Sequence, residues 1–257
     1  MNYLDLAILA AKEAGKIHKK YFKTGIKIKE KTNSFDLVTN ADLEAEEKII
    51  SLVQKSFPDH NFLAEEGKYQ KTNSPYTWVI DPLDGTNNFS SGLTIFCVSI
   101  ALIYKAEVIA GVIYDVMRDE LFYAEKGKGA YLNGEKIKVS SVDEFKRALL
   151  ITGFYYDRGK DMLECLEHIK KFFLKRILGL RRLGAAALDL CYVACGRVSG
   201  FWEFKLSPWD FSAGKLIIEE AGGKVTQRHG EAVSCLNNSF IVASNTKIHE
   251  KMLEVLR

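Results

Sequence analysis

The sequence has few of the features that mark secreted, membrane or thiolate-metal proteins. It holds five cysteines in 257 residues, an odd number, and no two of them form a C-x-x-C pair. This pattern favours reduced thiols in the cytoplasm over a disulfide framework or a zinc knuckle. No apolar run approaches the length that spans a bilayer. Asp5 and Glu13 interrupt the apolar N-terminal stretch, unlike a signal peptide. We therefore expect a soluble, cytoplasmic protein with no membrane contact.

Charge of one sign, repeats and linkers are also scarce. The net charge is only +3 and the basic residues are spread along the chain, so nucleic acid is not the default partner. No internal repeat, low-complexity tract or Pro/Gly/Ser-rich linker divides the chain. The 47% of hydrophobic residues suffices for a sizeable core. We expect one domain over residues 1–257, and any subdivision would fall near 145–150, between a strand-rich and a helix-rich part.

Hydrophobic periodicity predicts a layered α/β protein. Helical spacing is found at 3–22, 40–57, about 159–173, 184–195, 209–221 and 246–256. Runs rich in β-branched and aromatic residues predict strands at 61–64, 78–80, 96–104, 108–116, 120–127 and 238–243. Asn133-Gly134 predicts a hairpin turn. Asn40 is the expected N-cap of the second helix, and Pro58 lies just beyond its end.

Four acidic clusters stand out from this background. They are DLVTNAD at 36–42, LAEEG at 63–67, WVIDPLDGTNNF at 78–89 and LSPWD at 206–210. Each has an ordinary explanation, because Asp42 suits a first helical turn, Glu65 and Glu66 suit a solvated turn, and Asp210 suits an N-cap. Taken together, the clusters fit a hard-metal site better, since such sites collect carboxylates from the ends of strands and helices.

Electrostatics explains why these carboxylates would need metal ions. Two carboxylates about 4 Å apart repel by roughly 4 kcal/mol at an effective dielectric constant near 20, and divalent cations remove that cost. Oxygen-only ligands select magnesium, manganese or calcium over zinc. The five histidines all lie outside the acidic motifs, so a zinc site or a phosphohistidine mechanism has little support. If a helix begins after Gly85, its free N–H groups would form a phosphate site beside the Thr86 hydroxyl.

Asp81 and Asp84 leave two mechanisms open at this point. One of them could attack the substrate and form a covalent bond, or both could hold metal ions that activate a water. Phosphatases of the haloacid dehalogenase type also use aspartates followed by Gly-Thr, but their pair is separated by one residue. Here two residues intervene, and Pro82 is expected to break the strand. This spacing disfavours the covalent route.

The four motifs, in this order and spacing, resemble the inositol monophosphatase family. PWDFSAGKLIIEEAGG, KGKGAYLNGEKIKVS and GAAALDLCYVACGRVSGFWE extend the resemblance over nearly the whole chain. The resemblance implies the layered αβαβα sandwich of the magnesium-dependent, lithium-inhibited sugar phosphatases, which include fructose-1,6-bisphosphatase, and a homodimer. Two or three Mg²⁺ ions per active site are implied, with Mn²⁺ as a substitute.

The resemblance also implies metal ligands. Glu65, Asp81 and the Leu83 carbonyl would hold the first ion, and Asp81, Asp84 and Asp210 the second. Glu65 would help to hold a weaker third ion. Isoleucine often stands at position 83 in the family, but leucine changes little because only the carbonyl is needed.

Further roles concern the substrate and the attacking water. Gly85 and Thr86 would bind phosphate beside Asp84, while Ala186 and Glu203 would contact the substrate. Thr86, paired with Asp42, would orient and deprotonate the water with the help of Glu65. Lys31 stands where the family has a mobile-loop lysine near the metals. Residues 154–182 are less motif-like, and substrate choice is expected to be set there.

These implied roles lead to one main function and two alternatives. The main expectation is a phosphomonoesterase for myo-inositol 1-phosphate or a related polyol phosphate, hydrolysed by a metal-activated water. The first alternative is fructose-1,6-bisphosphatase activity, alone or in addition. The second is a regulatory protein that binds the transcription machinery and retains the metal site, since some bacterial members act there. The basic stretch at 170–182 would suit that partner, but a solvated helix face or a dimer contact explains it better.

Overall fold

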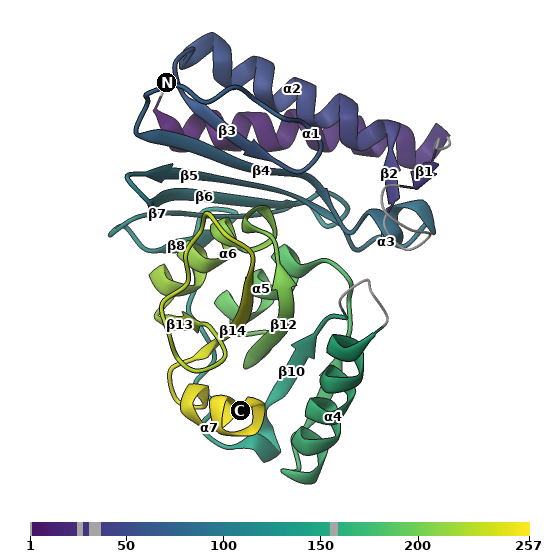
Figure 1. Cartoon of the computed structure of the whole chain (residues 1–257), viewed down its shortest axis with the longest axis vertical. Helices are drawn as coiled ribbons and strands as arrows, with labels where there is room; N and C mark the ends of the chain where they lie inside the picture. The colour runs from purple at the N-terminus through teal and green to yellow at the C-terminus, as the bar shows by residue number, and fades with distance from the viewer. Residues whose placement is uncertain (1, 25–27, 31–36, 155–158) are drawn as a thin grey trace.

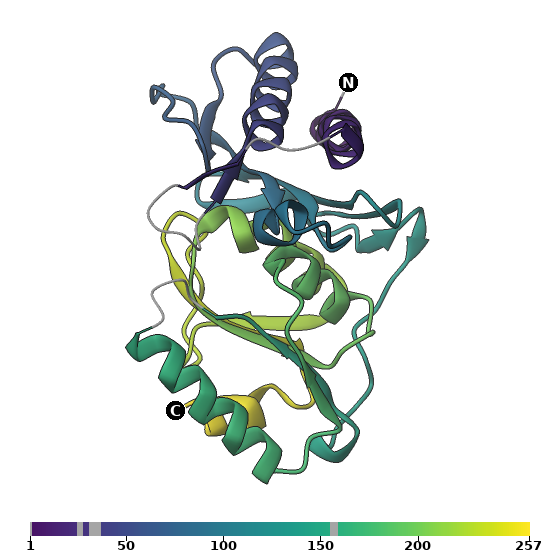
Figure 2. The same ribbon diagram turned by 90° about the vertical axis from the view of Figure 1, so that its right-hand side faces the viewer.

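The chain is layered from end to end. The computed structural model describes residues 2–24, 28–30, 37–154 and 159–257. Helices α1 (Tyr3–Thr24) and α2 (Asn40–Ser56) form one outer layer, and α4 (Lys160–Leu174) and α7 (His249–Leu256) form the other. Between them lie two sheets that enclose α5 (Ala186–Ala194) and α6 (Pro208–Glu220) (Figures 1 and 2). This arrangement confirms the predicted αβαβα sandwich.

The larger sheet has seven strands in the order β3-β4-β5-β6-β7-β8-β9. Their bounds are Asn61–Ala64, Tyr76–Asp84, Cys97–Tyr104, Glu107–Asp115, Glu120–Glu125, Ala130–Leu132 and Glu135–Lys136. Neighbours are antiparallel except for β3 and β4, which are parallel. Along β4, Trp78 and Ile80 face α1 and α2, whereas Val79 faces α5 and α6. The alternation follows from the two-residue period of a strand with both faces covered.

The smaller sheet has five strands in the order β11-β10-β12-β14-β13. Their bounds are Gly179–Arg181, Leu149–Thr152, Gly200–Leu206, Ser239–Asn245 and Gly223–Thr226. Only β14 was predicted. Strands β10, β11 and β13 were missed because they have only three or four residues. Strands β10 and β12 are also largely buried, so no alternation of polar and apolar residues distinguishes them from helix.

Three clusters of buried side chains hold the layers together. One lies between the outer pair α1 and α2 and the larger sheet, one surrounds α5 and α6 between the sheets, and one lies between the smaller sheet and the helices α4 and α7. The middle cluster contacts both sheets. It therefore fixes the end of β4 relative to the starts of α5 and α6, where the acidic residues lie.

Several local predictions are confirmed and others are corrected. Asn133 and Gly134 form the predicted hairpin turn, with φ of 49° and 92°. The predicted N-cap Asn40 is wrong, because Thr39 caps α2 and its Oγ1 accepts the Ala41 N–H at 3.1 Å. Pro82 does not end its strand, since β4 continues to Asp84 with a shift in the pairing register after Asp81.

The remaining elements are small. Strands β1 (Ile28–Glu30) and β2 (Leu37–Thr39) pair as a separate antiparallel ribbon, and α3 (Thr86–Ser90) is a single turn after β4. The chain passes from the larger to the smaller sheet between Lys136 and Leu149, close to the predicted seam, and the single-domain organisation stays a prediction. Among the described residues, no helix combines the length and apolarity that crossing a membrane requires.

Candidate active site

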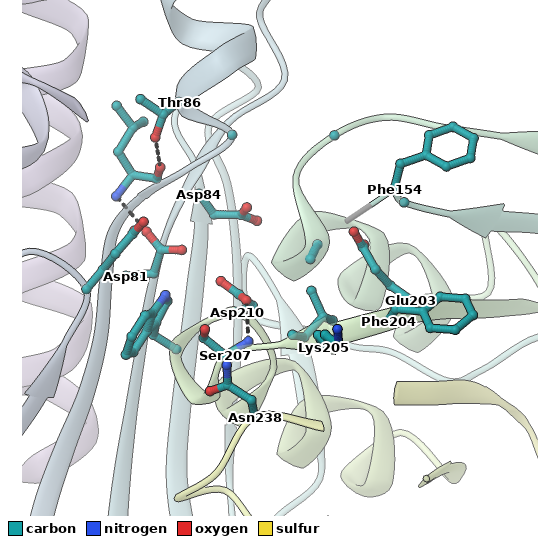
Figure 3. Close-up of a pocket in the computed structure, with 18 of the residues that line it drawn as sticks. Asp81, Asp84, Thr86, Phe154, Glu203, Phe204, Lys205, Ser207, Asp210 and Asn238 are labelled. Carbon is teal, nitrogen blue, oxygen red and sulfur yellow. Dashed lines mark hydrogen bonds between the residues drawn. The ribbon is translucent and has the colours of Figure 1, made fainter. Parts of the chain in front are cut away.

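Three of the four acidic motifs meet at one cavity between the two sheets. The cavity has a volume of about 330 Å³, and Glu65, Asp81, Asp84 and Asp210 all line it. Glu65 follows β3, the two aspartates come from the end of β4, and Asp210 comes from the first turn of α6. Figure 3 shows Asp81, Asp84 and Asp210 on one side of the cavity and Glu203, from β12, on the other. Residues from three acidic motifs, together with Glu203, therefore form one site.

The end of β4 holds its two aspartates by backbone contacts. The Leu83 N–H donates to Asp81 Oδ1 at 2.9 Å. The Ala187 N–H, in the first turn of α5, donates to Asp84 Oδ2 at 2.7 Å, and the Cys97 thiol lies 3.6 Å from the same oxygen. The register shift after Asp81 allows both carboxylates to reach the cavity, because it interrupts the alternation of a regular strand.

Two helix starts hold the other two aspartates in the same manner. Asp42 is the third residue of α2, and its Oδ2 accepts the Thr39 N–H at 2.9 Å. Asp210 is the third residue of α6, and its Oδ2 accepts the Ser207 N–H at 2.7 Å. Asp210 is thus not the N-cap; Ser207 is. In both helices the acid completes a capping box, so helix formation itself positions the carboxylate.

Thr86 and Gly85 lie where β4 turns into α3. Gly85 has φ of 96°, a left-handed conformation that favours glycine, and a Cβ there would lie 2.8 Å from the Ile95 carbonyl oxygen. The Thr86 hydroxyl lies 3.1 Å from Asp42 Oδ1 and 3.0 Å from the Leu83 carbonyl oxygen. Because a hydroxyl has one proton, it donates to only one of the two at a time. Asp42 therefore contacts the site through Thr86 and does not line the cavity.

Burial and crowding make these carboxylates costly to ionise. Burial, reinforced by Glu65 and the neighbouring aspartates, raises the pKa of Asp81 well above its usual range. Burial and the charges of Asp84 and Glu65 do the same to the pKa of Asp210. Burial raises the pKa of Asp84 to about 6, although the Ala187 N–H acts in the opposite direction. The site thus concentrates negative charge that a cation would offset.

The donor chemistry fits a hard divalent cation. The acids that line this part of the cavity offer only oxygen ligands, the type that selects magnesium or manganese over zinc. Over residues 2–24, 28–30, 37–154 and 159–257, no three side chains of His, Cys, Asp or Glu lie close enough together to form a ready-made metal cage. Leu83 also lines the cavity, and its carbonyl oxygen accepts from the Thr86 hydroxyl at 3.0 Å.

Glu203 forms the opposite wall with residues of different chemistry. Burial raises the pKa of Glu203 to about 8, opposed by Arg182 and reinforced by Asp84. The exposed residue Arg182 also lines the cavity, as do Phe154 and Phe204. This half of the cavity offers one half-buried carboxyl group, a cation and aromatic rings, which suits a small polyhydroxy group.

Most of the predicted site residues line this cavity, and some important neighbours were missed. The predicted residues that line it are Glu65, Asp81, Leu83, Asp84, Gly85, Thr86, Ala186, Glu203 and Asp210. Lys31 lies outside the described residues. Sequence reasoning missed Arg182, Ser207 and Cys97. The S-P-W-D pattern at 207–210 is a capping-box signature and could have identified Ser207, whereas no signal in the sequence marks Arg182 or Cys97.

Comparisons with known proteins cover nearly the whole chain. The model of the inositol monophosphatase family matches residues 2–257. Nus factor SuhB of Escherichia coli (strain K12) is 41% identical over 256 residues, covering 99% of this chain and 95% of that protein.

Two solved structures show the same fold. The IMPase of Thermotoga maritima superposes with a TM-score of 0.90 at 37% identity, covering 100% of this chain and 97% of that one. An IMPase/NADP phosphatase complexed with Mg²⁺ and phosphate superposes with a TM-score of 0.84 at 26% identity, covering 95% of this chain and 90% of the other.

Proposed function

The chain belongs to the inositol monophosphatase family, and on this premise we propose that it is a magnesium-dependent phosphomonoesterase of small polyol phosphates, with myo-inositol 1-phosphate as the first candidate. One observation carries the proposal: a single cavity is lined by four carboxylates and by the half-buried Glu203, and Figure 3 shows Asp81, Asp84 and Asp210 on the side opposite Glu203. The acidic side suits metal and phosphate, and the Glu203 side suits the alcohol. The family and its Mg²⁺- and phosphate-bound relative support this division.

Each side chain has a role in this proposal. Mg²⁺ would be held by Glu65, Asp81, Asp84, Asp210 and the Leu83 carbonyl, and it would supply charge neutralisation and a more acidic water. The backbone N–H groups at Gly85 and Thr86 would bind the phosphate oxygens. Ala186, at the start of α5, would contact the substrate beside Asp84.

The contact between Thr86 and Asp42 provides a path for a proton. The attacking water would donate to Thr86 Oγ1, and Thr86 would donate its own proton to Asp42 Oδ1, 3.1 Å away. Asp42 Oδ2 is held by the Thr39 N–H, so the carboxylate keeps its orientation during the transfer. The water oxygen bonds to phosphorus as the bond from phosphorus to the alcohol oxygen breaks, and the departing alkoxide takes up a proton from solvent to give the alcohol. Neither Asp81 nor Asp84 carries the phosphate.

Fructose 1,6-bisphosphate is the alternative substrate. A second phosphate needs a cationic partner, and Arg182 and Lys205 both line the cavity. Lys205, however, contacts Asp161 at 2.5 Å, and the wall beside Arg182 carries the half-buried Glu203. The inositol phosphate is therefore placed first.

A second role with the transcription machinery is supported by relatives. The Escherichia coli relative is called a Nus factor. The acid set of this chain argues for catalysis, but a separate surface can carry another role. The family resemblance also leads us to propose a homodimer in the cytoplasm.

The test of the proposed function is phosphate release with magnesium or a chelator, over a panel of sugar and nucleotide phosphates ranked by kcat/KM. We expect Asp84→Asn to lower kcat by roughly a hundredfold or more, because losing a charged metal ligand costs several kcal/mol of transition-state stabilisation. The variant should stay folded, since asparagine retains an oxygen for the Ala187 N–H. Asp59→Asn, at an exposed turn residue, is the control. Full activity of Asp84→Asn in chelator contradicts the proposal.

A further inference from the structure

The Glu203 carboxylate is packed against a glycine of the neighbouring strand. Strands β10 and β12 are parallel, with Leu150 opposite Gly200 and Thr152 opposite Trp202. The next residues in this register are Gly153 and Glu203. Side chains at one register position of parallel strands point to the same face of a sheet, so a side chain at 153 would be directed at Glu203.

The distances show that no side chain fits at position 153. A Cβ built on Gly153 would lie 2.1 Å from Cδ and from both carboxylate oxygens of Glu203. The Glu203 carboxylate therefore occupies the volume that any other residue at 153 would fill. Gly153 is not among the glycines with positive φ, so the backbone conformation does not require glycine there. Glycine is required at position 153 because the Glu203 carboxylate fills the space that a side chain would need.

A side-chain hydrogen bond links the two strands beside this pair. The Thr152 hydroxyl donates to the Trp202 carbonyl oxygen at 2.7 Å, directly before the Gly153 and Glu203 pair. Trp202 is fully buried. A larger residue at 153 is thus accommodated by displacement of the Glu203 carboxylate, which is the flexible end of its side chain.

We propose that Gly153 is a specificity-determining residue, because the space left by its missing side chain holds the Glu203 carboxyl group in the position where it recognises a hydroxyl of the substrate alcohol. Gly153 and Glu203 both line the cavity. Hydrogen bonds weaken steeply when the partner moves from its optimal distance and angle. Displacing the carboxyl group therefore removes the discrimination in favour of hydroxyl-bearing esters. This inference rests on the proposed phosphatase function.

The kinetic test compares Gly153→Ala with Gly179→Ala. Gly179 also lies on a strand of the smaller sheet without positive φ, and a Cβ there makes only ordinary contacts at 3.4 Å. We expect Gly153→Ala to lower kcat/KM for myo-inositol 1-phosphate, mainly through KM, at least about tenfold more than for 4-nitrophenyl phosphate, which has no hydroxyl to recognise. Glu203→Asp in the same chain, one methylene shorter, should recover part of the loss. An equal loss on both substrates overturns the proposal.

A thermal double-mutant cycle tests the packing without any substrate. Gly153→Ala should lower Tm in the wild-type background and have little effect in a Glu203→Ala background, where the clash is absent. An equal decrease in Tm in both backgrounds overturns the proposal. If the wild type hydrolyses neither ester, the proposed function fails by itself. Non-additive Tm values would then still support the contact between Gly153 and Glu203. The specificity that Gly153 determines would in that case concern another ligand of the same cavity.

Discussion

Glu203→Gln should stabilise the metal-free protein at neutral pH. The Glu203 side chain lines the cavity and is half-buried, and desolvation by the surrounding protein raises the pKa of its carboxyl group from 4.5 to about 8. At pH 7 the folded state therefore keeps a proton that the unfolded chain releases, and this difference opposes folding. Glutamine has nearly the same shape and no ionisation, so the substitution removes the cost.

The magnitude follows from the two pKa values. A difference of one pKa unit corresponds to about 1.4 kcal/mol, so the cost is on the order of 3 kcal/mol at pH 7 and larger above pH 8. The folded-state pKa is the raised one, so the cost disappears as the pH falls through the unfolded-state value of 4.5. At pH 4.5 the gain from Glu203→Gln should be below about 1 kcal/mol by the same relation.

The assay is urea denaturation of wild type and variant in chelator between pH 4.5 and 8. Glu167→Gln, at an exposed glutamate of α4 paired with Lys170, controls for the general effect of losing a charge. We expect the stability difference for Glu203→Gln to grow with pH, while the variant loses preference for inositol phosphate. A difference that is zero, or equal at all pH values, refutes the view that Glu203 is a half-buried acid with a raised pKa.

Two further predictions concern acid stability and stereochemistry. His18 is buried, with neither ring nitrogen hydrogen-bonded among the described residues, and burial lowers its pKa to about 3. The unfolded chain therefore protonates this histidine more readily than the folded protein does. As a result, the free energy of unfolding should fall by about 2 kcal/mol between pH 7 and pH 5. His18→Phe should flatten that pH profile in urea titrations, and the exposed His229→Phe should not. Direct attack by water should invert the configuration of a chiral phosphate ester, because only one displacement occurs. Retention of configuration, or an acid-trapped phosphopeptide containing Asp81, contradicts the mechanism.

The sequence predicts the acidic half of the site better than the alcohol half. The motifs that contain Asp81, Asp84 and Asp210 consist of residue types that indicate metal binding. The three side chains converge because they lie at the ends of strands and helices. Gly153 was missed because an absent side chain has meaning only when its neighbour Glu203 is known. That neighbour is on β12, and both β10 and β12 were missed because buried strands lack a polar alternation.

The four aspartates have a structural role in addition to the proposed catalytic one, because each contacts the backbone. Asp42, Asp81, Asp84 and Asp210 each satisfy a backbone N–H, so replacing any of them by alanine leaves a donor without its partner, at a cost of about 1–3 kcal/mol if the donor stays buried. A chain that had lost its activity would still have a structural reason to retain them.

Glu203 carries a cost of burial at neutral pH, because its pKa is raised to about 8. Asp81, Asp84 and Asp210 carry the same kind of cost, but their contacts with backbone N–H groups offset part of it. The cavity therefore holds acids that weaken the metal-free fold, which is the expected cost of a site that must bind a cation and a polar ligand.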